Sequence, residues 1–211
     1  MISSADIDGE KAALRKVLIA RRAGASKDRL AAAQALSRHF RLAFPAIAHG
    51  AVVAFYMPMR DEMDPRALIA DLAAGRDDLV FALPRTPPKG AGLPLSFHIA
   101  PPEADLVKSA FGVLEPAPDT PVVTPDIVLA PLLGFDRRAF RLGYGAGHYD
   151  RTLAALRARH PVRAVGLAWA CQEVDRIPTD DFDQRLDGVV TEAGFFPSPP
   201  RGGEGGREAV G

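Results

Sequence analysis

Largely apolar runs alternate with amphipathic segments along the chain, and this alternation predicts the secondary structure. Short apolar runs rich in strand-forming residues are typical of strands buried in a parallel sheet. We expect six strands, at residues 51–56, 79–83, 95–99, 127–130, 163–169 and 188–191. Apolar side chains that repeat with helical spacing predict four helices, at residues 10–22, 26–40, 65–74 and 149–159.

Capping and turn residues mark where several of these elements begin and end. Asp8 and Ser26 are the expected N-caps of the first two helices, and Asp64 precedes a proline at the start of the third. Proline, glycine and lysine follow one another closely in residues 84–93, which predicts a loop.

The order of the elements indicates the fold class. Helices that alternate with short buried strands predict an α/β fold, with a mainly parallel sheet and helices on both faces. We expect a single three-layer α/β/α domain over residues 1–197. Residues 198–211 (SPPRGGEGGREAVG) have almost no apolar side chains to bury, so we expect a disordered tail without a part in catalysis.

Composition and charge exclude several classes of function. Hydrophobic residues make up 47% of the 211 residues, and 26 basic residues balance 26 acidic ones. A net charge near zero gives no global attraction to nucleic acid or to an anionic membrane, so we expect neither partner. No apolar run approaches the ~20 residues of a membrane helix, and Asp6 and Asp8 lie where a signal peptide would be basic. The single cysteine, Cys171, favours a reducing, cytoplasmic location.

The segment RLGYGAGHYDR, residues 141–151, carries the most specific chemistry. Gly143, Gly145 and Gly147 alternate before a helix, so the backbone can adopt positive φ angles and direct N–H groups at an anion. The spacing matches neither the dinucleotide-binding GxGxxG nor a Walker A loop. Taken alone it predicts an anion site, and a tight turn without a ligand is an equal alternative.

Asp150 follows this glycine turn directly. A carboxylate beside bound phosphate requires an intervening cation, and Mg²⁺ combines a few protein oxygens with phosphate oxygens and water. The alternative is that Asp150 merely stabilises the first turn of the following helix.

Residues 141–153 and the preceding PLLGFD at 131–136 resemble the signature of the 5-formyltetrahydrofolate cyclo-ligase family. Further blocks resemble the same family in the same order: KAALR at 11–15, YMPMRDEMD at 56–64, GVLEP at 112–116, and 166–172 with 177–187. Two positions depart from the family pattern. Ala146 replaces a residue that is often Gly or Lys, and His148 replaces the first Tyr of Tyr-Tyr-Asp.

The resemblance implies an activity and its ligands. The family closes 5-formyltetrahydrofolate into 5,10-methenyltetrahydrofolate: ATP phosphorylates the formyl oxygen, nitrogen 10 attacks the activated carbon, and ADP and phosphate are released. Such phosphoryl transfers depend on positioning and charge neutralisation. The implied ligands are therefore ATP, a reduced folate and Mg²⁺, and we expect a monomer or weak homodimer.

The resemblance also implies the residues of the site, although it assigns no catalytic residue. ATP would contact Lys11, Arg15, Arg141, Gly143, Tyr144, Gly145, Ala146, Gly147, His148 and Tyr149. The folate would contact Met57, Glu62, Tyr144, Gly145, Ala146, Gly147 and His148. Asp150 and Asp183 would hold the metal, but the acidic neighbours Asp180, Asp181 and Asp187 leave the choice of the second ligand open.

Each assignment has a simpler alternative. Lys11 and Arg15 would otherwise form a solvated basic face, and Glu62 an exposed loop acid. Two other functions fit the sequence: a relative that binds nucleotide or folate without turnover, or another phosphate-binding enzyme such as a sugar-phosphate isomerase. The cyclo-ligase interpretation requires Lys11 and Arg15 to lie beside the glycine turn.

Overall fold

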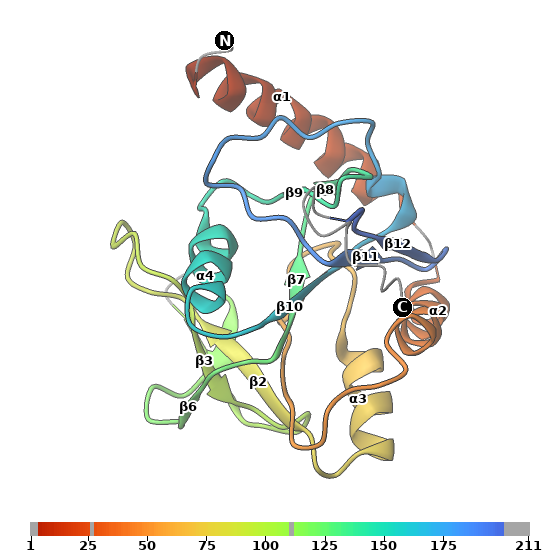
Figure 1. Ribbon diagram of the computed structural model, residues 1–211, viewed down its shortest axis with the longest axis vertical. Helices are drawn as coiled ribbons and strands as arrows, with labels where there is room; N and C mark the ends of the chain where they lie inside the picture. The colour runs from red at the N-terminus through yellow and green to blue at the C-terminus, as the bar shows by residue number, and fades with distance from the viewer. Residues whose placement is uncertain (1–3, 26–27, 110–111, 201–211) are drawn as a thin grey trace, which may run out of the picture.

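The computed structural model describes residues 4–25, 28–109 and 112–200 (Figure 1). The helices are α1 (Ser4–Ala23), α2 (Arg29–Ala43), α3 (Arg66–Gly75), α4 (His148–Arg157) and the 3-10 helix η1 (Ala170–Gln172). The main sheet contains β1 (Val52–Ala54), β2 (Val80–Arg85), β3 (Ser96–Ile99), β6 (Val122–Val123), β7 (Ile127–Pro131), β10 (Arg163–Leu167), β11 (Gly188–Val190) and β12 (Phe195–Pro197). Two small sheets pair β4 (Leu106–Lys108) with β5 (Leu114–Pro116), and β8 (Gly134–Phe135) with β9 (Arg141–Leu142).

The main sheet is mainly parallel, as the sequence predicts. Its strand order is β12-β11-β10-β7-β1-β2-β3-β6, and the five strands from β11 to β2 pair in parallel. At the edges, β12, β3 and β6 pair antiparallel. The central strands read as continuous apolar runs because both of their faces are buried: Val53 and Leu129 belong to one core cluster, and Ala54 and Val128 to another.

Helices cover both faces of this sheet, which confirms the expected α/β fold class. On one face Leu36 and Phe40 of α2 pack against the strands together with Leu68 and Leu72 of α3. On the other face α4 contributes Leu153. In Figure 1 the central strands lie between α4 on one side and α2 and α3 on the other.

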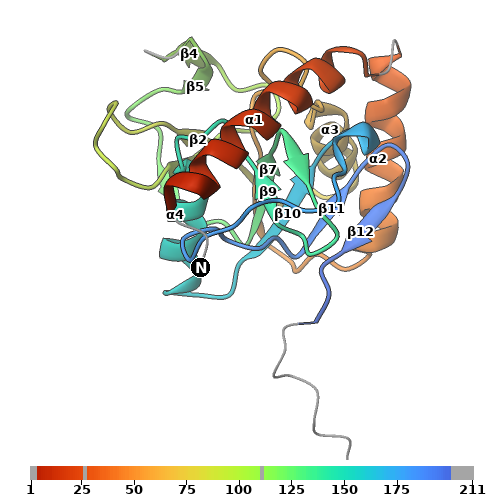
Figure 2. The same ribbon diagram turned by 90° about the horizontal axis from the view of Figure 1, so that it is seen from above.

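The first helix takes neither face but crosses the edge where the parallel strands end (Figure 2). Its buried residue Leu18 packs against Leu133, Leu142 and Ile177. A Cβ added to Gly134 would lie 2.5 Å from a methyl carbon of Leu18, so only glycine permits this approach of β8 to the helix. The polar residues of α1 are thereby placed above the carboxyl ends of the strands.

Several expected boundaries need correction. The first helix begins at Ser4, so Asp8 lies inside it and is not its cap. Ser26 lies outside the described residues, and Asp28 caps α2 by accepting a hydrogen bond of 2.9 Å from the Ala31 N–H. Asp64 precedes the actual N-cap of α3, although its carboxylate still accepts from a first-turn N–H.

Other corrections concern strands and the tail. The segment 84–93 is not all loop, because β2 extends to Arg85. Most of the expected tail, residues 201–211, lies outside the described residues. At its start, the Ser198 N–H donates to the Asp187 carbonyl oxygen at 3.2 Å. None of the helices in the described part of the chain has the length and apolarity needed to cross a bilayer.

Candidate functional site

A cavity of about 920 Å³ lies at the carboxyl ends of the central strands. Its walls come from α1, the segment after β1, the turn between β9 and α4, and the acidic loop 180–184. Every residue that the sequence assigned to a ligand lines it: Lys11, Arg15, Met57, Glu62, Arg141, Gly143, Tyr144, Gly145, Ala146, Gly147, His148, Tyr149, Asp150 and Asp183. Open parallel sheets bind their ligands at this edge, so the topology explains the convergence.

The glycine turn has the left-handed geometry that its sequence indicates. Gly145 has φ 103°, and Gly147, the N-cap of α4, has φ 65°. A side chain at either position would be strained, and a Cβ at Gly145 would lie 3.2 Å from the guanidinium carbon of Arg15. The turn therefore presents bare backbone to the cavity at the positive end of a helix, which is an arrangement suited to phosphate.

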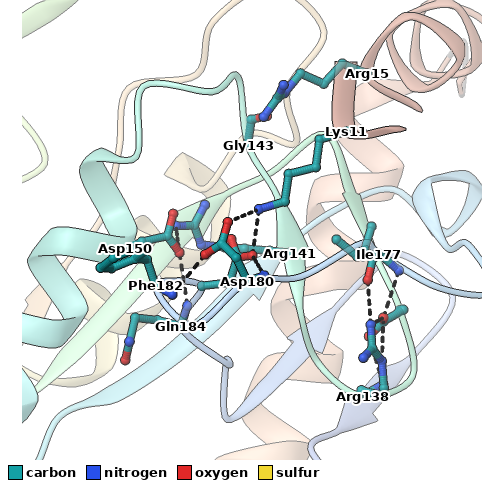
Figure 3. Close-up of polar contacts among 12 residues, drawn as sticks. Lys11, Arg15, Arg138, Arg141, Gly143, Asp150, Ile177, Asp180, Phe182 and Gln184 are labelled. Atoms are coloured by element: carbon teal, nitrogen blue, oxygen red, sulfur yellow. Dashed lines mark hydrogen bonds and ion pairs between the residues drawn. The ribbon is translucent and has the colours of Figure 1, made fainter. Parts of the chain in front are cut away.

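The first helix reaches this turn directly. Arg15 donates a hydrogen bond from Nε to the carbonyl oxygen of Gly143 at 2.9 Å (Figure 3). One helical turn earlier, Lys11 also faces the cavity. The arrangement that the cyclo-ligase interpretation requires, with the N-terminal cations beside the glycine turn, is present.

Lys11 is buried rather than solvated, which excludes the solvated-face alternative for this residue. Its Nζ lies 2.6 Å from Asp183 Oδ2 and 3.0 Å from Asp180 Oδ2. Burial alone would lower the pKa of Lys11, but the hydrogen bonds to these two carboxylates outweigh it and raise the pKa above its ordinary value. Lys11 thus stays charged at the cavity wall.

Asp150 and Asp183 lie on the same side of the cavity, although the two are far apart in sequence. Asp150 Oδ1 is 2.9 Å from Arg141 Nη2 and accepts a hydrogen bond of 3.2 Å from the Gln184 N–H. Asp183 Oδ2 accepts one of 2.8 Å from the Asp180 N–H. Figure 3 shows Asp150, Asp180, Lys11 and Arg141 gathered at this wall.

The acidic groups are too few to enclose a metal by themselves. Within the described ranges, no three His, Cys, Asp or Glu side chains converge as a metal site would require. Mg²⁺ nevertheless binds through one or two carboxylates when phosphates and water complete its octahedron. Asp150 and Asp183 beside a phosphate-compatible turn fit that donor set.

Arg141 supplies a buried positive charge at the wall of the cavity. Its Nη2 is close to Asp150 but outside hydrogen-bond geometry, and its Nε has no partner among the described residues. Its guanidinium carbon also lies 5.4 Å from the ring centre of Tyr149. A buried guanidinium with unused N–H groups is a suitable donor for an anionic ligand.

The opposite wall contains a buried carboxylate. Glu62 is only 5% exposed, and its Oε2 accepts a hydrogen bond of 2.8 Å from the Met59 N–H. Burial raises the pKa of Glu62, although the Met59 N–H and the charges of Arg22 and Arg60 oppose the shift. Glu62 is therefore not an exposed loop acid, and with Met57 it gives this end of the cavity a mixed apolar and acidic lining.

The two departures from the family pattern lie at the cavity as well. Arg151 donates from Nη2 to the Ala146 carbonyl oxygen at 2.7 Å, so a cation stands beside the position where some relatives carry lysine. Burial, together with the charge of Arg151, lowers the pKa of His148, which keeps its imidazole neutral near pH 7.

Sequence reasoning missed two polar residues at or next to the cavity, the buried Arg22 and Glu115. Asp180, which was considered only as an acidic neighbour of Asp183, shares Lys11 with it. One signal was available for Arg22, because residues 11, 15 and 22 repeat at helical spacing on one face of α1. Gln172 was assigned no role from the sequence, and in the structure it donates to the carbonyl oxygens of Leu132 and Leu133, which is a structural role.

Comparison with known proteins agrees with this geometry. A model of the 5-formyltetrahydrofolate cyclo-ligase family matches residues 7–192. The chain is 34% identical over 157 residues to the 5-formyltetrahydrofolate cyclo-ligase of Escherichia coli strain K12, covering 71% of this chain and 82% of the relative. It is 34% identical over 146 residues to the enzyme of that name from Mycolicibacterium smegmatis, covering 67% and 74%. The NMR structure of Aquifex aeolicus 5,10-methenyltetrahydrofolate synthetase superimposes with a TM-score of 0.72 at 26% identity, over 95% of this chain and 96% of that chain.

Proposed function

Because the chain belongs to the 5-formyltetrahydrofolate cyclo-ligase family, it is a ligase of folate one-carbon metabolism, and we propose that it activates the formyl group of 5-formyltetrahydrofolate with ATP. The γ-phosphoryl group passes to the formyl oxygen, and ADP is released. Nitrogen 10 of the same folate then attacks the formyl carbon, forming the new C–N bond. The phosphorylated oxygen leaves as inorganic phosphate, which yields 5,10-methenyltetrahydrofolate.

One observation carries this proposal: a single cavity combines a phosphate-compatible glycine turn with an acidic and apolar region at Glu62 and Met57, called the acidic pocket below. Phosphoryl transfer requires the γ-phosphate and the accepting oxygen to be aligned, which a shared cavity provides. Arg15 and Lys11 support the assignment of the turn to the triphosphate, because both cations border it.

The acidic pocket suits the pterin half of a reduced folate. The pterin ring carries adjacent N–H groups, and a carboxylate that is fixed by a backbone N–H accepts such donors well. Glu62 is that carboxylate, and Met57 offers an apolar surface beside it. His148 and Tyr149, at the start of α4, lie between this pocket and the phosphate turn in our assignment.

Magnesium is the proposed cofactor, with Asp150 and Asp183 as its protein ligands. It would supply positive charge to the triphosphate. In the free protein Lys11 and Arg141 neutralise the same two carboxylates. Both cations are therefore within reach of a triphosphate bound at this wall.

The remaining sequence-based expectations form part of the proposal. A monomer or weak homodimer, a cytoplasmic location, and the absence of nucleic-acid and membrane partners stay predictions. The near-zero net charge and the single cysteine support them.

The deciding experiment mixes the purified protein with 5-formyltetrahydrofolate, ATP and MgCl₂ and follows the near-ultraviolet absorbance of the methenyl product. We expect product only when ATP and magnesium are both present, with one ADP formed per ring closed. Binding of folate or ATP without product would identify a non-catalytic relative, which is the function that the departures at Ala146 and His148 would favour. No effect of folate at all would point to a different phosphate-binding enzyme.

A further inference from the structure

Arg22 is a buried cation that the proposed chemistry does not use. It lies on the same face of α1 as Lys11 and Arg15, toward the end of the helix. Its side chain is 3% exposed, and its Nη2 donates to the hydroxyl oxygen of Tyr144 at 2.5 Å. The guanidinium carbon lies 5.7 Å from the centre of the same ring.

The contacts to Tyr144 compensate this burial only in part. The Nε and Nη1 groups of Arg22 have no hydrogen-bond partner among the described residues, and the side chain forms no ion pair within that part of the chain. A buried guanidinium without a carboxylate partner destabilises a fold, because desolvation is not offset by pairing. Arg22 therefore needs an explanation other than stability.

The contact with Tyr144 provides one. Tyr144 is 43% exposed, lines the cavity and sits between two glycines, one of which has φ 103°. Because glycine neighbours give the backbone conformational freedom, a large exposed ring at this position can adopt several orientations. The hydroxyl bond and the cation–π contact from Arg22 select one of them.

The electrostatic surroundings indicate which substrate this selection serves. Arg22 contributes a favourable charge to Glu62 and Tyr56, both at the pterin end of the cavity. Arg15, two turns earlier on the helix, contacts the backbone of the same glycine turn at Gly143. Through its bond to Arg22, the Tyr144 hydroxyl is thereby linked to the charge that acts on Glu62, which the proposed function assigns to the folate.

We propose that Arg22 is a positioning residue that fixes the Tyr144 ring against the bound folate and thereby sets folate affinity. The inference rests on the proposed function, since it assigns the Glu62 end of the cavity to the folate. Arg22 itself does not touch substrate, because its side chain is covered.

The test is a double-mutant cycle with Arg22→Met, Tyr144→Phe and the double variant. Tyr144→Phe removes only the hydroxyl group, so it keeps the test informative even if Arg22→Met folds poorly. We expect each single change to raise the KM for 5-formyltetrahydrofolate about 10-fold while the KM for ATP changes less than about 3-fold. The double variant should be no worse than either single variant, because both changes break one interaction.

Arg21→Met is the matched control. Arg21 is the exposed neighbour on the same helix turn, and among the described residues it donates to the carbonyl oxygens of Cys171 and Glu173. We expect its folate KM to equal that of the parent. Arg22→Lys, which keeps the charge but loses the planar fork, should recover part of the affinity.

Two outcomes would overturn the proposal. Additive effects in the double variant would mean that Arg22 and Tyr144 act separately, and an unchanged folate KM in Tyr144→Phe would remove the tethered ring from recognition. The same double-mutant cycle can be measured without turnover, from the dissociation constant for 5-formyltetrahydrofolate determined by fluorescence in the absence of ATP. A parent protein that binds folate but forms no product would therefore refute the proposed reaction while still testing Arg22.

Discussion

Charged side chains that are buried around one cavity are the clearest functional signal at the scale of single residues. Lys11 is balanced by two carboxylates, whereas Glu62 has only a backbone N–H and more distant arginines. Burial of an incompletely paired charge destabilises the fold. Such charges are found mainly at functional sites, where they bind ligands. Glu62 therefore offers a way to separate stability from function.

We expect Glu62→Gln to stabilise the folded protein at pH 7–8 while weakening folate binding. The raised pKa of Glu62 means that the folded state holds the proton more tightly than the unfolded state. Ionised Glu62 thus lowers stability at neutral pH, and the neutral amide does not. Tm should rise by a few degrees, since each kcal/mol corresponds to roughly 2–4 °C in a chain of this size.

The pH dependence provides the control for this prediction. Well below pH 4.5, the ordinary pKa of this carboxyl, both states of the parent are protonated and the Tm difference should disappear. Glu103→Gln, at an exposed position, should leave Tm unchanged at every pH. A Glu62→Gln variant that is less stable at pH 8 than the parent would show that the carboxylate is structural.

Asp150→Asn tests the metal assignment at the same scale. The amide oxygen can still accept from the Gln184 N–H, so the fold should persist, but loss of the charge beside the buried Arg141 should lower Tm. Loss of the negative charge should raise the magnesium concentration for half-maximal activity by at least roughly 10-fold. Asp77→Asn, an exposed aspartate, is the control. Unchanged magnesium dependence in Asp150→Asn would remove this residue from the metal site.

At the scale of elements, α1 is the part that completes the site. Leu18 is fully buried against Leu133, Leu142 and Ile177, on the same helix that carries Lys11. We expect Leu18→Ala to destabilise the protein by about 2–5 kcal/mol, because it leaves a cavity in the core. It should also raise the KM for ATP, because α1 then packs less tightly against the ends of the strands. Thermal unfolding and initial-rate kinetics measure the two effects.

Val17→Ala is the matched comparison for this helix. Val17 precedes Leu18 and is largely exposed, so its loss should change neither Tm nor the KM for ATP appreciably. If Leu18→Ala lowered Tm but left the KM for ATP unchanged, the docking of α1 would be irrelevant to nucleotide binding.

The elements that the sequence predicted well are those whose pattern is local. The parallel strands, such as β7 and β10, are continuous apolar runs. Helices α2, α3 and α4 were found within three residues of both ends, whereas α1 begins six residues before its expected start. The missed strands are short and depend on a partner for their definition. Strand β12, for example, ends at a proline and exists only through its antiparallel register with β11.

The residues of the site were likewise predictable where their pattern is local in the sequence. Its motifs around Gly145 and Asp150 are contiguous in the chain, so the family resemblance identified them. The bond between Arg22 and Tyr144 joins residues 122 positions apart, and no local pattern encodes it. The ion pairs of Lys11 with Asp180 and Asp183 likewise become evident only when the acidic loop folds against α1.

At the scale of the whole molecule, the cavity joins segments from the first, middle and last parts of the described chain. Helix α1, the segment after β1, the glycine turn and the acidic loop 180–184 all contribute side chains to it. Contacts such as Lys11 with Asp183 and Arg15 with Gly143 already join these walls. A ligand that fills the cavity adds further links between the same segments.

Saturating MgATP should consequently stabilise the entire fold. At a ligand concentration of 100 times Kd, binding to the folded state alone adds about 2.7 kcal/mol, or roughly 5–10 °C in Tm. Arg15→Met should lose most of this shift, because its guanidinium borders the glycine turn. Lys16→Met, the exposed next residue, should retain it. Differential scanning fluorimetry with MgCl₂ alone as baseline measures the shift, and equal shifts in both variants would place the nucleotide elsewhere on the molecule.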